Sequence, residues 1–587
     1  MNKNYYIVFF LLLGAVFYLP FLGRVPLFDW DEINFAESAR EMLVSGNYTQ
    51  VQINYHPFWE KPPLFFWLQA VSMHLFGVNE FAARFPNAVF GIVTLLTLFV
   101  AGRRWHGTQF GFWWALAYWG SFLPHFYFKS GIIDPVFNYF IFLGIIFLAE
   151  ALHIQPGRSK QRGIILAGSC AGLAVLTKGP VGFLLIALTT VCVAAVLWWQ
   201  YRNNRQQLQA VFPETVRIGL FLKACLLFLL PMLFVASFWF IPELLQNGPD
   251  VLVKFIKYQI RLFATPDAGH RQPFFYHWVV VLLGCFPMSV AALPAFLHNN
   301  NSKESTGQRL LQLWMICLFM VVLVVFTIVK TKIVHYSSLA YLPLSYLAAR
   351  YIYRTVSQSG TGGTQATESV VAPLPAGPAL PVHRYVRTVL LLAGTVFGLV
   401  LALVPLAGKY KTVIAPLLKD PFARGCLEVP VAWTGWECLP GLLYLLLVWA
   451  VVVTRLKTNA AAGWGSLFAG TAVVILAFTP WIAPKIEQHS QGTVINFYKS
   501  MQGKPVYVEP IGFKSYAHYF YFNLPPGHCP PQYSDKWLLE GNIDKPAYLI
   551  TKITKTNLVS QYPDVQLLNT TGGFAFFVRQ PPEKGQH

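Results

Sequence analysis

Long apolar runs separated by short polar loops fill the chain from its N-terminus to about residue 482. An apolar run of roughly 17–25 residues is long enough to cross a bilayer as a helix. We therefore expect a polytopic α-helical membrane protein. The pattern predicts about thirteen transmembrane helices, over residues 5–22, 87–102, 108–126, 134–152, 164–178, 180–199, 218–241, 276–297, 310–329, 336–352, 387–406, 438–455 and 464–482.

Lysine and arginine residues fall in alternate loops of this map. If the N-terminus is cytoplasmic, every loop on the cytoplasmic side is basic, as the positive-inside rule requires. An odd number of spans then places the C-terminus outside, on the same side as the long polar loop at residues 23–86.

The polar segments divide the chain into two domains. Residues 1–482 form the membrane domain, in which the outer loop at 23–86 carries amphipathic helices. Residues 355–386 are rich in Gly, Thr, Ala and Pro, which is typical of a flexible linker, here cytoplasmic. Residues 483–587 carry short β-rich runs spaced by turn residues, and we expect a small soluble α/β domain outside the membrane.

Composition supports a membrane protein and argues against nucleic acid as a partner. Charged residues make up 12% of the chain, against about 25% in soluble proteins. The formal net charge of +19 comes mostly from short loops between spans, where it indicates topology and contact with anionic membrane lipids. Cys426 and Cys438 share an outer loop and are expected to form a disulfide, with Cys529 as a competing partner.

The stretch "DWDEINFAESAREML", residues 29–43, has helical spacing and opens with three acids. Asp29 as N-cap and Glu32 three residues later would form a capping box. Asp31 has no part in that motif and stays ionised beside a helix N-terminus, where it is available as a base or a cation ligand. Function and capping are both open for these acids.

The stretch "EKPP", residues 60–63, precedes another helix. Pro62 and Pro63 favour an extended approach and a helix start at Leu64. Lys61 is then held near a helix N-terminus, where anions are favoured, so it is a candidate phosphate ligand. Glu60 would hold a cation or the lysine itself. The alternative is a surface salt bridge worth under about 1 kcal/mol.

Two further charged residues stand at outer helix ends. Asp134 opens an otherwise apolar helix, which is costly unless the acid is paired. Lys129 is its candidate structural partner. Lys178, in "TKGP", is predicted on the outer side, where the positive-inside rule disfavours lysine. Its position therefore suggests that it binds an anionic ligand.

Two later outer segments add basic and hydroxyl groups. The first contains Arg261, His270 and Arg271, and a lone histidine such as His270 is more often a packing residue than a ligand. The second, "KTKIVHYSSLAYLPL", contains two lysines, His335 and Tyr336, and favours a phosphate ligand. Every unusual polar residue therefore falls on one membrane face.

In this order, "DWDEINFAESAREML", "EKPPLFFW", "NEFAARFPNAV", "TKGPVGF", "HRQPFFYHW" and the stretch Lys-Ile-Val-His-Tyr resemble a known family. They are similar to the bacterial aminoarabinose transferases and their dolichyl-phosphate-mannose protein mannosyltransferase-like relatives. These are polytopic type-C glycosyltransferases that use lipid-phosphate sugars. The resemblance covers roughly residues 1–350, and later residues match only in architecture.

The resemblance implies a role for each matching residue. Asp31 and Asp134 are the expected catalytic acids, and Glu60 and His270 the ligands of a divalent metal such as zinc, magnesium or manganese. The chain has Gln259 where the family often has a histidine, and His335 in place of a small or polar residue would compensate. The donor phosphate is expected to contact Lys61 and Tyr336, and the charges described above add Lys178, Arg261 and Arg271.

We therefore expect a glycosyltransferase that moves a sugar from undecaprenyl phosphate to a lipid A-like, glycan or protein acceptor. The expected location is the bacterial inner membrane, with the active site and the C-terminal domain in the periplasm. One alternative is a protein O-mannosyltransferase. The other is a lipid or sugar transporter without chemistry, but transporters place polar residues near the membrane midplane and often contain repeats, and neither feature is found.

Overall fold

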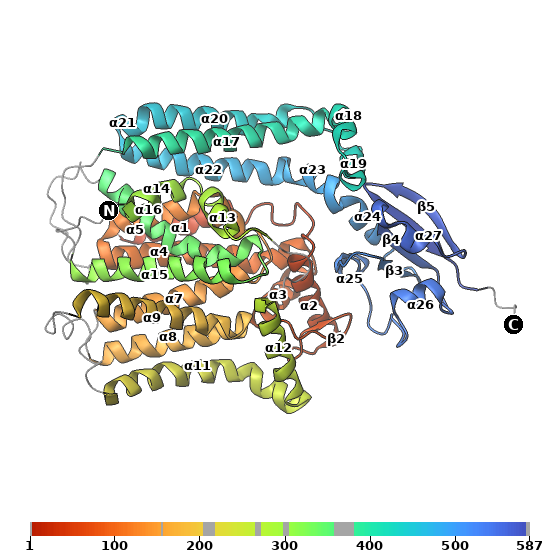
Figure 1. The fold of residues 1–587 in the computed structure, drawn as a ribbon, viewed down its shortest axis with the longest axis horizontal. Coiled ribbons are helices and arrows are strands. Elements are labelled where there is room, and N and C mark those ends of the chain that lie inside the picture. Colours follow the sequence, from red (N-terminus) through yellow and green to blue (C-terminus); the bar gives the residue numbers. More distant parts are fainter. Residues whose placement is uncertain are drawn as a thin grey trace.

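The computed structural model describes residues 3–153, 157–202, 218–264, 272–297, 305–356 and 381–582. A body of roughly parallel helices fills the left and centre of Figure 1, and a small sheet domain lies to its right. Helices α2, α3 and α12 lie between the two. We call this end of the body the loop end.

The helical body contains most of the apolar sequence. Four of its buried tryptophans, Trp105, Trp114, Trp314 and Trp464, are each at most 1% exposed. Its helices are α1 (Lys3–Tyr18), α4 (Glu80–His106), α5 (Thr108–Trp119), α6 (Phe122–Tyr127), α7 (Asp134–His153), α8 (Gly157–Lys178), α9 (Val181–Tyr201), α11 (Ile218–Asn247), α13 (Tyr276–Gly284), α14 (Met288–Leu297), α15 (Thr306–Ile328), α16 (Tyr341–Val356), α17 (Arg384–Lys409), α20 (Leu439–Ala450) and α22 (Ala460–Trp481).

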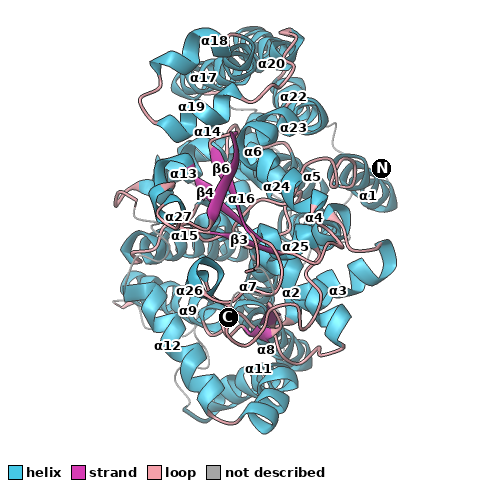
Figure 2. Cartoon of the chain, turned by 90° about the vertical axis from the view of Figure 1, so that its right-hand side faces the viewer, coloured by secondary structure: helices cyan, strands magenta, loops and turns pink. Residues whose placement is uncertain are grey.

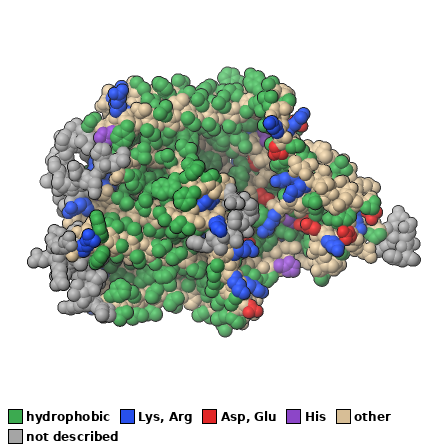
Figure 3. All heavy atoms as spheres, in the orientation of Figure 1, with side chains coloured by type: hydrophobic (Ala, Val, Ile, Leu, Met, Phe, Trp, Pro, Cys, Tyr) green, Lys and Arg blue, Asp and Glu red, His purple; other side chains and the backbone are tan. Residues whose placement is uncertain are grey.

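Eight helices in the described ranges are long and apolar enough to cross a bilayer, and α13 with α14 would add a ninth as a span bent by 116°. Hydrophobic side chains cover the middle of the body on the face seen in Figure 3, while lysines and arginines gather towards its two ends. The predicted polytopic α-helical class is confirmed. The count of thirteen stays a prediction, because helices such as α1 and α16 are shorter than a full span.

At the loop end, residues 23–86 form two helices and a small hairpin. The elements are α2 (Asp31–Ser45), β1 (Gln52–Ile53), β2 (His56–Pro57) and α3 (Leu64–Phe76). Helix α12 (Asp250–Ala264) lies at the same end of the body, near α3 in Figure 1, and the 3-10 helix η1 (Val334–Ala340) follows α15. Short elements link the later spans: α18 (Lys411–Ile414), η2 (Ala415–Leu417), α19 (Pro421–Glu428), η3 (Trp436–Cys438), η4 (Val451–Arg455), α21 (Leu456–Thr458), α23 (Ala483–Glu487) and η5 (Gln488–Gly492).

The C-terminal part folds around one four-stranded sheet, facing the viewer in Figure 2, with strand order β3-β4-β6-β5. Strands β3 and β4 are parallel, and the other neighbours are antiparallel. Gly572 and Gly573 turn the last hairpin with φ of 62° and 80°, which glycine adopts without strain. The elements are α24 (Thr493–Ser500), β3 (Tyr507–Pro510), α25 (Ala517–Phe522), α26 (Asp535–Glu540), β4 (Ala547–Lys552), η6 (Ile553–Lys555), α27 (Asn557–Ser560), β5 (Val565–Thr571) and β6 (Phe574–Arg579).

The C-terminal part packs directly on the loop that carries α2. One apolar cluster joins Ile33 and Ala36 of α2 to Tyr498 and Phe520. The Leu27 backbone N–H donates to the Tyr521 hydroxyl at 2.7 Å. The sheet domain therefore helps to position the acid-rich loop, although nearly 500 residues separate the two in sequence.

Two sequence-based expectations for this region are wrong. Helix α2 begins at Asp31 without a side-chain cap, so Asp29 and Glu32 form no capping box. The Asp29 carboxylate accepts from the Tyr516 backbone N–H instead. Cys426 and Cys438 are both unpaired, and the Cys426 thiol donates to the Gly572 carbonyl oxygen because α19 docks on the sheet hairpin.

The predicted linker and domain boundaries are only partly covered by the structure. Of residues 355–386, positions 357–380 lie outside the described residues. Helix α17 already begins at Arg384. The boundary near residue 482 falls between α22 and α23, where the chain leaves the helical body.

Candidate active site

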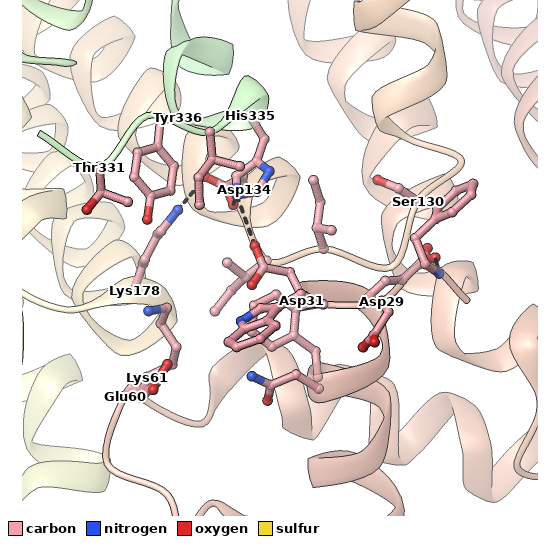
Figure 4. Close-up of a pocket in the computed structure, with 18 of the residues that line it drawn as sticks. Asp29, Asp31, Glu60, Lys61, Ser130, Asp134, Lys178, Thr331, His335 and Tyr336 are labelled. Atoms are coloured by element: carbon pink, nitrogen blue, oxygen red, sulfur yellow. Dashed lines mark hydrogen bonds and ion pairs between the residues drawn. The ribbon is translucent and has the colours of Figure 1, made fainter. Parts of the chain in front are cut away.

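A cavity of about 260 Å³ opens at the loop end, where residues from six separate parts of the chain meet. Figure 4 shows charged side chains from these parts turned toward it. Its polar lining comprises Asp29, Asp31, Glu32 and Asn34 of the first loop and α2, Glu60 and Lys61 before α3, Ser130 and Asp134 at α7, Lys178 at the end of α8, Tyr258 of α12, and Thr331, His335 and Tyr336 around η1.

Two carboxylates face one imidazole at the centre of this cavity. The His335 Nε2 atom lies 3.2 Å from Asp31 Oδ2 and 3.7 Å from Asp134 Oδ2. The other Asp134 oxygen forms an ion pair with Lys178 Nζ. Lys178 is thus the partner of Asp134, whereas Lys129 donates to the Phe17, Tyr18 and Pro20 carbonyl oxygens. Acids some hundred residues apart in sequence therefore share one polar network.

The charges around Asp31 keep it ionised. Burial alone would raise the pKa of this carboxyl, but the hydrogen bond with His335 and the positive charges of Lys61 and Lys178 outweigh burial and lower it. Asp31 is thus a carboxylate over the ordinary pH range. It is available to accept a hydrogen bond or a proton from a bound molecule.

Lys61 supplies a second positive charge to the cavity. Burial lowers its pKa, and the neighbouring carboxylate of Glu60 opposes that shift. The Lys61 ammonium lies 5.2 Å from the centre of the Tyr258 ring, and the Tyr258 hydroxyl donates to Glu60 Oε2 at 2.7 Å. Helix α12 therefore holds the "EKPP" loop in place through Tyr258.

An apolar recess adjoins the charged cavity and shares four of its residues, Lys61, Asp134, Lys178 and Tyr336. The Lys178 ammonium lies 4.9 Å from the centre of the Tyr336 ring. The remaining lining is largely hydrophobic: Phe137, Val181, Leu185, Phe326, Val329 and Leu339, with Asn138 and Gln259. The charged cavity therefore continues, beside its two lysines, into an apolar recess.

One buried ion pair positions both acids. Glu32 forms a bidentate pair with Arg84 of α4, with Nε–Oε1 and Nη2–Oε2 distances of 2.8 and 2.7 Å. The same carboxylate accepts from the backbone N–H groups of Phe28 and Gly131. Glu32 therefore ties the loop before Asp31 to the loop before Asp134.

Six of the nine predicted site residues line this cavity, one lies outside its lining, and two fall outside the described residues. Asp31, Asp134, Lys61, Lys178, Glu60 and Tyr336 line it. Arg261 lies outside the lining on α12, with its guanidinium 5.1 Å from the Tyr258 ring centre. His270 and Arg271 lie outside the described residues. Tyr258 was not among the predicted site residues, and its only sequence signal is its place one turn before Arg261 on an amphipathic helix.

The described residues do not complete the predicted metal site. Glu60 is available as a ligand, but within the described ranges no three His, Cys, Asp or Glu side chains gather as a set that would hold a metal ion. Gln259 of α12, where the family often has a histidine, donates to the Glu60 carbonyl oxygen at 3.3 Å. The metal stays a prediction.

The fold and the cavity define a class, a multi-pass membrane protein whose charged site lies at the end of its helices. Residues 60–229 match the family described as dolichyl-phosphate-mannose-protein mannosyltransferase. The undecaprenyl phosphate-α-4-amino-4-deoxy-L-arabinose arabinosyl transferase of Erwinia tasmaniensis is 28% identical over 321 residues, 54% of each chain. A second arabinosyl transferase, from Pseudomonas fluorescens, is 27% identical over 319 residues, again 54% of each.

The match thus spans about half the length of these curated relatives. The fold extends further. The crystal structure of ArnT from Cupriavidus metallidurans bound to undecaprenyl phosphate superposes with a TM-score of 0.69, covering 98% of both chains at 17% identity. The resemblance to the aminoarabinose transferases and their mannosyltransferase-like relatives is thereby confirmed, and the chain has the fold of these type-C glycosyltransferases.

Proposed function

We propose that the protein is a glycosyltransferase that moves a sugar from a polyprenyl phosphate, such as undecaprenyl phosphate, to an acceptor at the membrane face. One observation carries the proposal: Lys61 and Lys178 lie with Asp31 and Asp134 in one cavity beside an apolar recess. The names of the curated relatives support the same activity and donor.

The charges suit the chemistry of this transfer. Breaking the bond between the anomeric carbon of the sugar and the phosphate oxygen leaves negative charge on the phosphate. Fixed cations in a partly desolvated site stabilise that charge best. Lys61 and Lys178 take this role, and Tyr336, beside Lys178, orients the phosphate. Asp31 is placed to bind the acceptor or take its proton, and Asp134 holds Lys178.

The acceptor class is part of the proposal. A lipid A-like molecule, another glycan and a protein are the candidates. The family description favours a protein O-mannosyltransferase as the second candidate function. Incubation with labelled undecaprenyl-phosphate sugars separates these possibilities. Label on a glycolipid supports a lipid A-like acceptor, and label on serine or threonine of a protein supports a protein O-mannosyltransferase.

We further place the protein in the bacterial inner membrane, with the cavity and the C-terminal domain in the periplasm. The basic loops of the opposite side support this orientation. A reporter that is active only in the cytoplasm, fused after His587, should give no signal. Strong signal would place the C-terminal domain and the cavity on the cytoplasmic side.

The test of the catalytic assignment is Asp31→Asn, which keeps the size of the side chain and removes its charge. As a general base Asp31 would contribute about 10²–10⁴-fold to turnover. We expect normal purification and a loss of sugar transfer of that order. The matched control is Glu428→Gln on α19, an exposed acid outside the cavity lining. If the Asp31→Asn protein transfers sugar at the wild-type rate, Asp31 has no catalytic role.

A further inference from the structure

Helix α12 supports the two loops that carry the cavity lysines. The Phe255 ring is 2% exposed and packs on Gly179, where an added Cβ atom would lie 2.7 Å from the Phe255 Cζ atom. Gly179 directly follows Lys178 in the "TKGP" turn. One turn further along α12, the Tyr258 hydroxyl donates to Glu60 Oε2 of the "EKPP" loop at 2.7 Å. The inner face of α12 therefore contacts both lysine loops at once.

Five exposed residues give α12 an amphipathic outer face. Val253, Ile256 and Ile260 are 47%, 52% and 62% exposed. Their spacing of three and four residues places them on one apolar stripe of the helix. Lys254 and Lys257, both exposed, form a basic stripe beside it. A helix with an apolar stripe flanked by lysines is suited to lie in the interface of a bilayer.

The chain enters α12 from a membrane span. Phe221–Asn247 of α11 is long and apolar enough to cross a bilayer, and Leu245 near its end is 79% exposed. Gly248, with a φ of 73°, and Pro249 then turn the chain into α12. Figure 1 shows α12 crossing the loop end from α11 towards α3. Helix α12 therefore lies at the level where this span leaves the bilayer.

We propose that the outer face of α12 binds anionic phospholipids of the bilayer, and that this contact holds the cavity ready for the donor. Lys254 and Lys257 bind the head-group phosphates, towards which lysines act as point charges. The apolar stripe lies at the boundary of the acyl chains. Asp250 is the only acid in the sequence of α12, so the helix attracts a negatively charged surface. The effect on sugar transfer rests on the function proposed above, to which the proposal adds a regulating partner.

The lipid acts on the donor through the two lysine loops. A bound molecule shifts the position of a helix only as far as it binds one position more tightly than another. Lys254 and Lys257 reach the head groups when α12 lies on the bilayer surface, and in that position its inner face holds both loops. Anionic lipids therefore favour the arrangement in which Lys61 and Lys178 both stand in the cavity. The donor phosphate then binds more tightly.

The first test measures sugar transfer by the full-length protein in two kinds of nanodisc. One contains phosphatidylcholine alone, and in the other phosphatidylglycerol replaces about one third of it. We expect the KM for labelled undecaprenyl-phosphate sugar to be about fivefold lower or more in the anionic discs, since each lysine near an anionic surface contributes about that factor. An equal KM in both discs would overturn the proposal while leaving the glycosyltransferase function standing.

Matched variants assign the lipid response to α12. Lys254→Gln/Lys257→Gln should remove the difference between the two discs, and Lys254→Arg/Lys257→Arg should keep it. The control Lys409→Gln/Lys419→Gln removes the same charge from two exposed lysines at the loop end outside α12, and it should respond to lipid as the wild type does. A Lys254→Gln/Lys257→Gln protein that keeps the full response would overturn the role of α12.

The second test needs no sugar transfer. Amide hydrogen exchange of α12 should be slower in the anionic discs than in phosphatidylcholine, because a docked helix opens less often. The difference should vanish in Lys254→Gln/Lys257→Gln, while strand β6 of the sheet domain exchanges alike in every sample and so reports an intact fold. Equal exchange of α12 in both discs would overturn the docking. If neither disc supports transfer but α12 still exchanges more slowly in the anionic one, the docking stands and the proposed function fails.

Discussion

Removing the charge of Glu32 should strongly destabilise the protein. The Glu32 and Arg84 side chains are 1% and 4% exposed, so neither is screened by water. Glu32→Gln would leave the charged Arg84 guanidinium buried among neutral acceptors, the remaining amide oxygen and the Leu22, Val25 and Pro26 carbonyl oxygens. Breaking a buried pair in this way costs about 3–5 kcal/mol.

The measurement is the unfolding of detergent-solubilised protein, followed by tryptophan fluorescence and by the fraction that stays monodisperse on gel filtration. The control is Glu428→Gln, because the Glu428–Arg424 pair is about half exposed on both sides and is worth under about 1 kcal/mol. The double variant Glu32→Gln/Arg84→Met removes both charges and should recover part of the loss.

The same change should slow sugar transfer, since Glu32 also accepts from the backbone N–H groups of Phe28 and Gly131 and so fixes the loops before Asp31 and Asp134. A loss of stability no larger than that of the Glu428→Gln control would refute the reasoning. It would mean that water reaches Arg84 and that the two loops are held by packing alone.

Three further predictions follow from the same site and from the sheet domain. Lys61→Ala should raise the KM for donor and lower turnover by about 10²–10³-fold, whereas Lys330→Ala, an exposed lysine outside the cavity lining, should change neither. Burial raises the pKa of Glu509 in β3 to about 8. The contribution of this carboxyl to folding stability is therefore full below about pH 4.5 and is lost as the pH rises through about 8. Glu509→Gln should flatten this decline in thermal unfolding curves measured over that pH range. If Glu60 and His270 hold a divalent ion, EDTA should reduce transfer and added Zn²⁺, Mg²⁺ or Mn²⁺ should restore it, and full activity after chelation would remove the metal from the proposal.

Much of the fold could be predicted from sequence because membrane spans are local features. An apolar run is recognised without knowing its neighbours, and the alternation of basic loops adds the topology. The limit appears where a span is short or bent, as in α13 and α14, which meet at 116°. There the run predicts a helix, but the angle is set by packing against other helices.

The charged residues of the site could also be predicted from local sequence, but their contacts could not. Asp31, Lys61 and Asp134 each stand out locally as charges at the edge of apolar sequence. What they contact is not local, since the partner of Asp134 is Lys178 and the residue between the two acids is His335. Sequence spacing does not encode such long-range pairs, so Lys129 was the nearer and wrong candidate for Asp134.

The four residues from Asp29 to Glu32 show how one short stretch divides between structure and chemistry. Asp29 accepts from the Tyr516 backbone and Glu32 pairs with Arg84, so the acids on either side of Asp31 bind the loop to the sheet domain and to α4. Asp31 alone points to the histidine in the cavity. Because its neighbours fix the backbone on both sides, Asp31 keeps its position with His335 as the contact of its carboxylate, and the rest of that carboxylate faces the cavity.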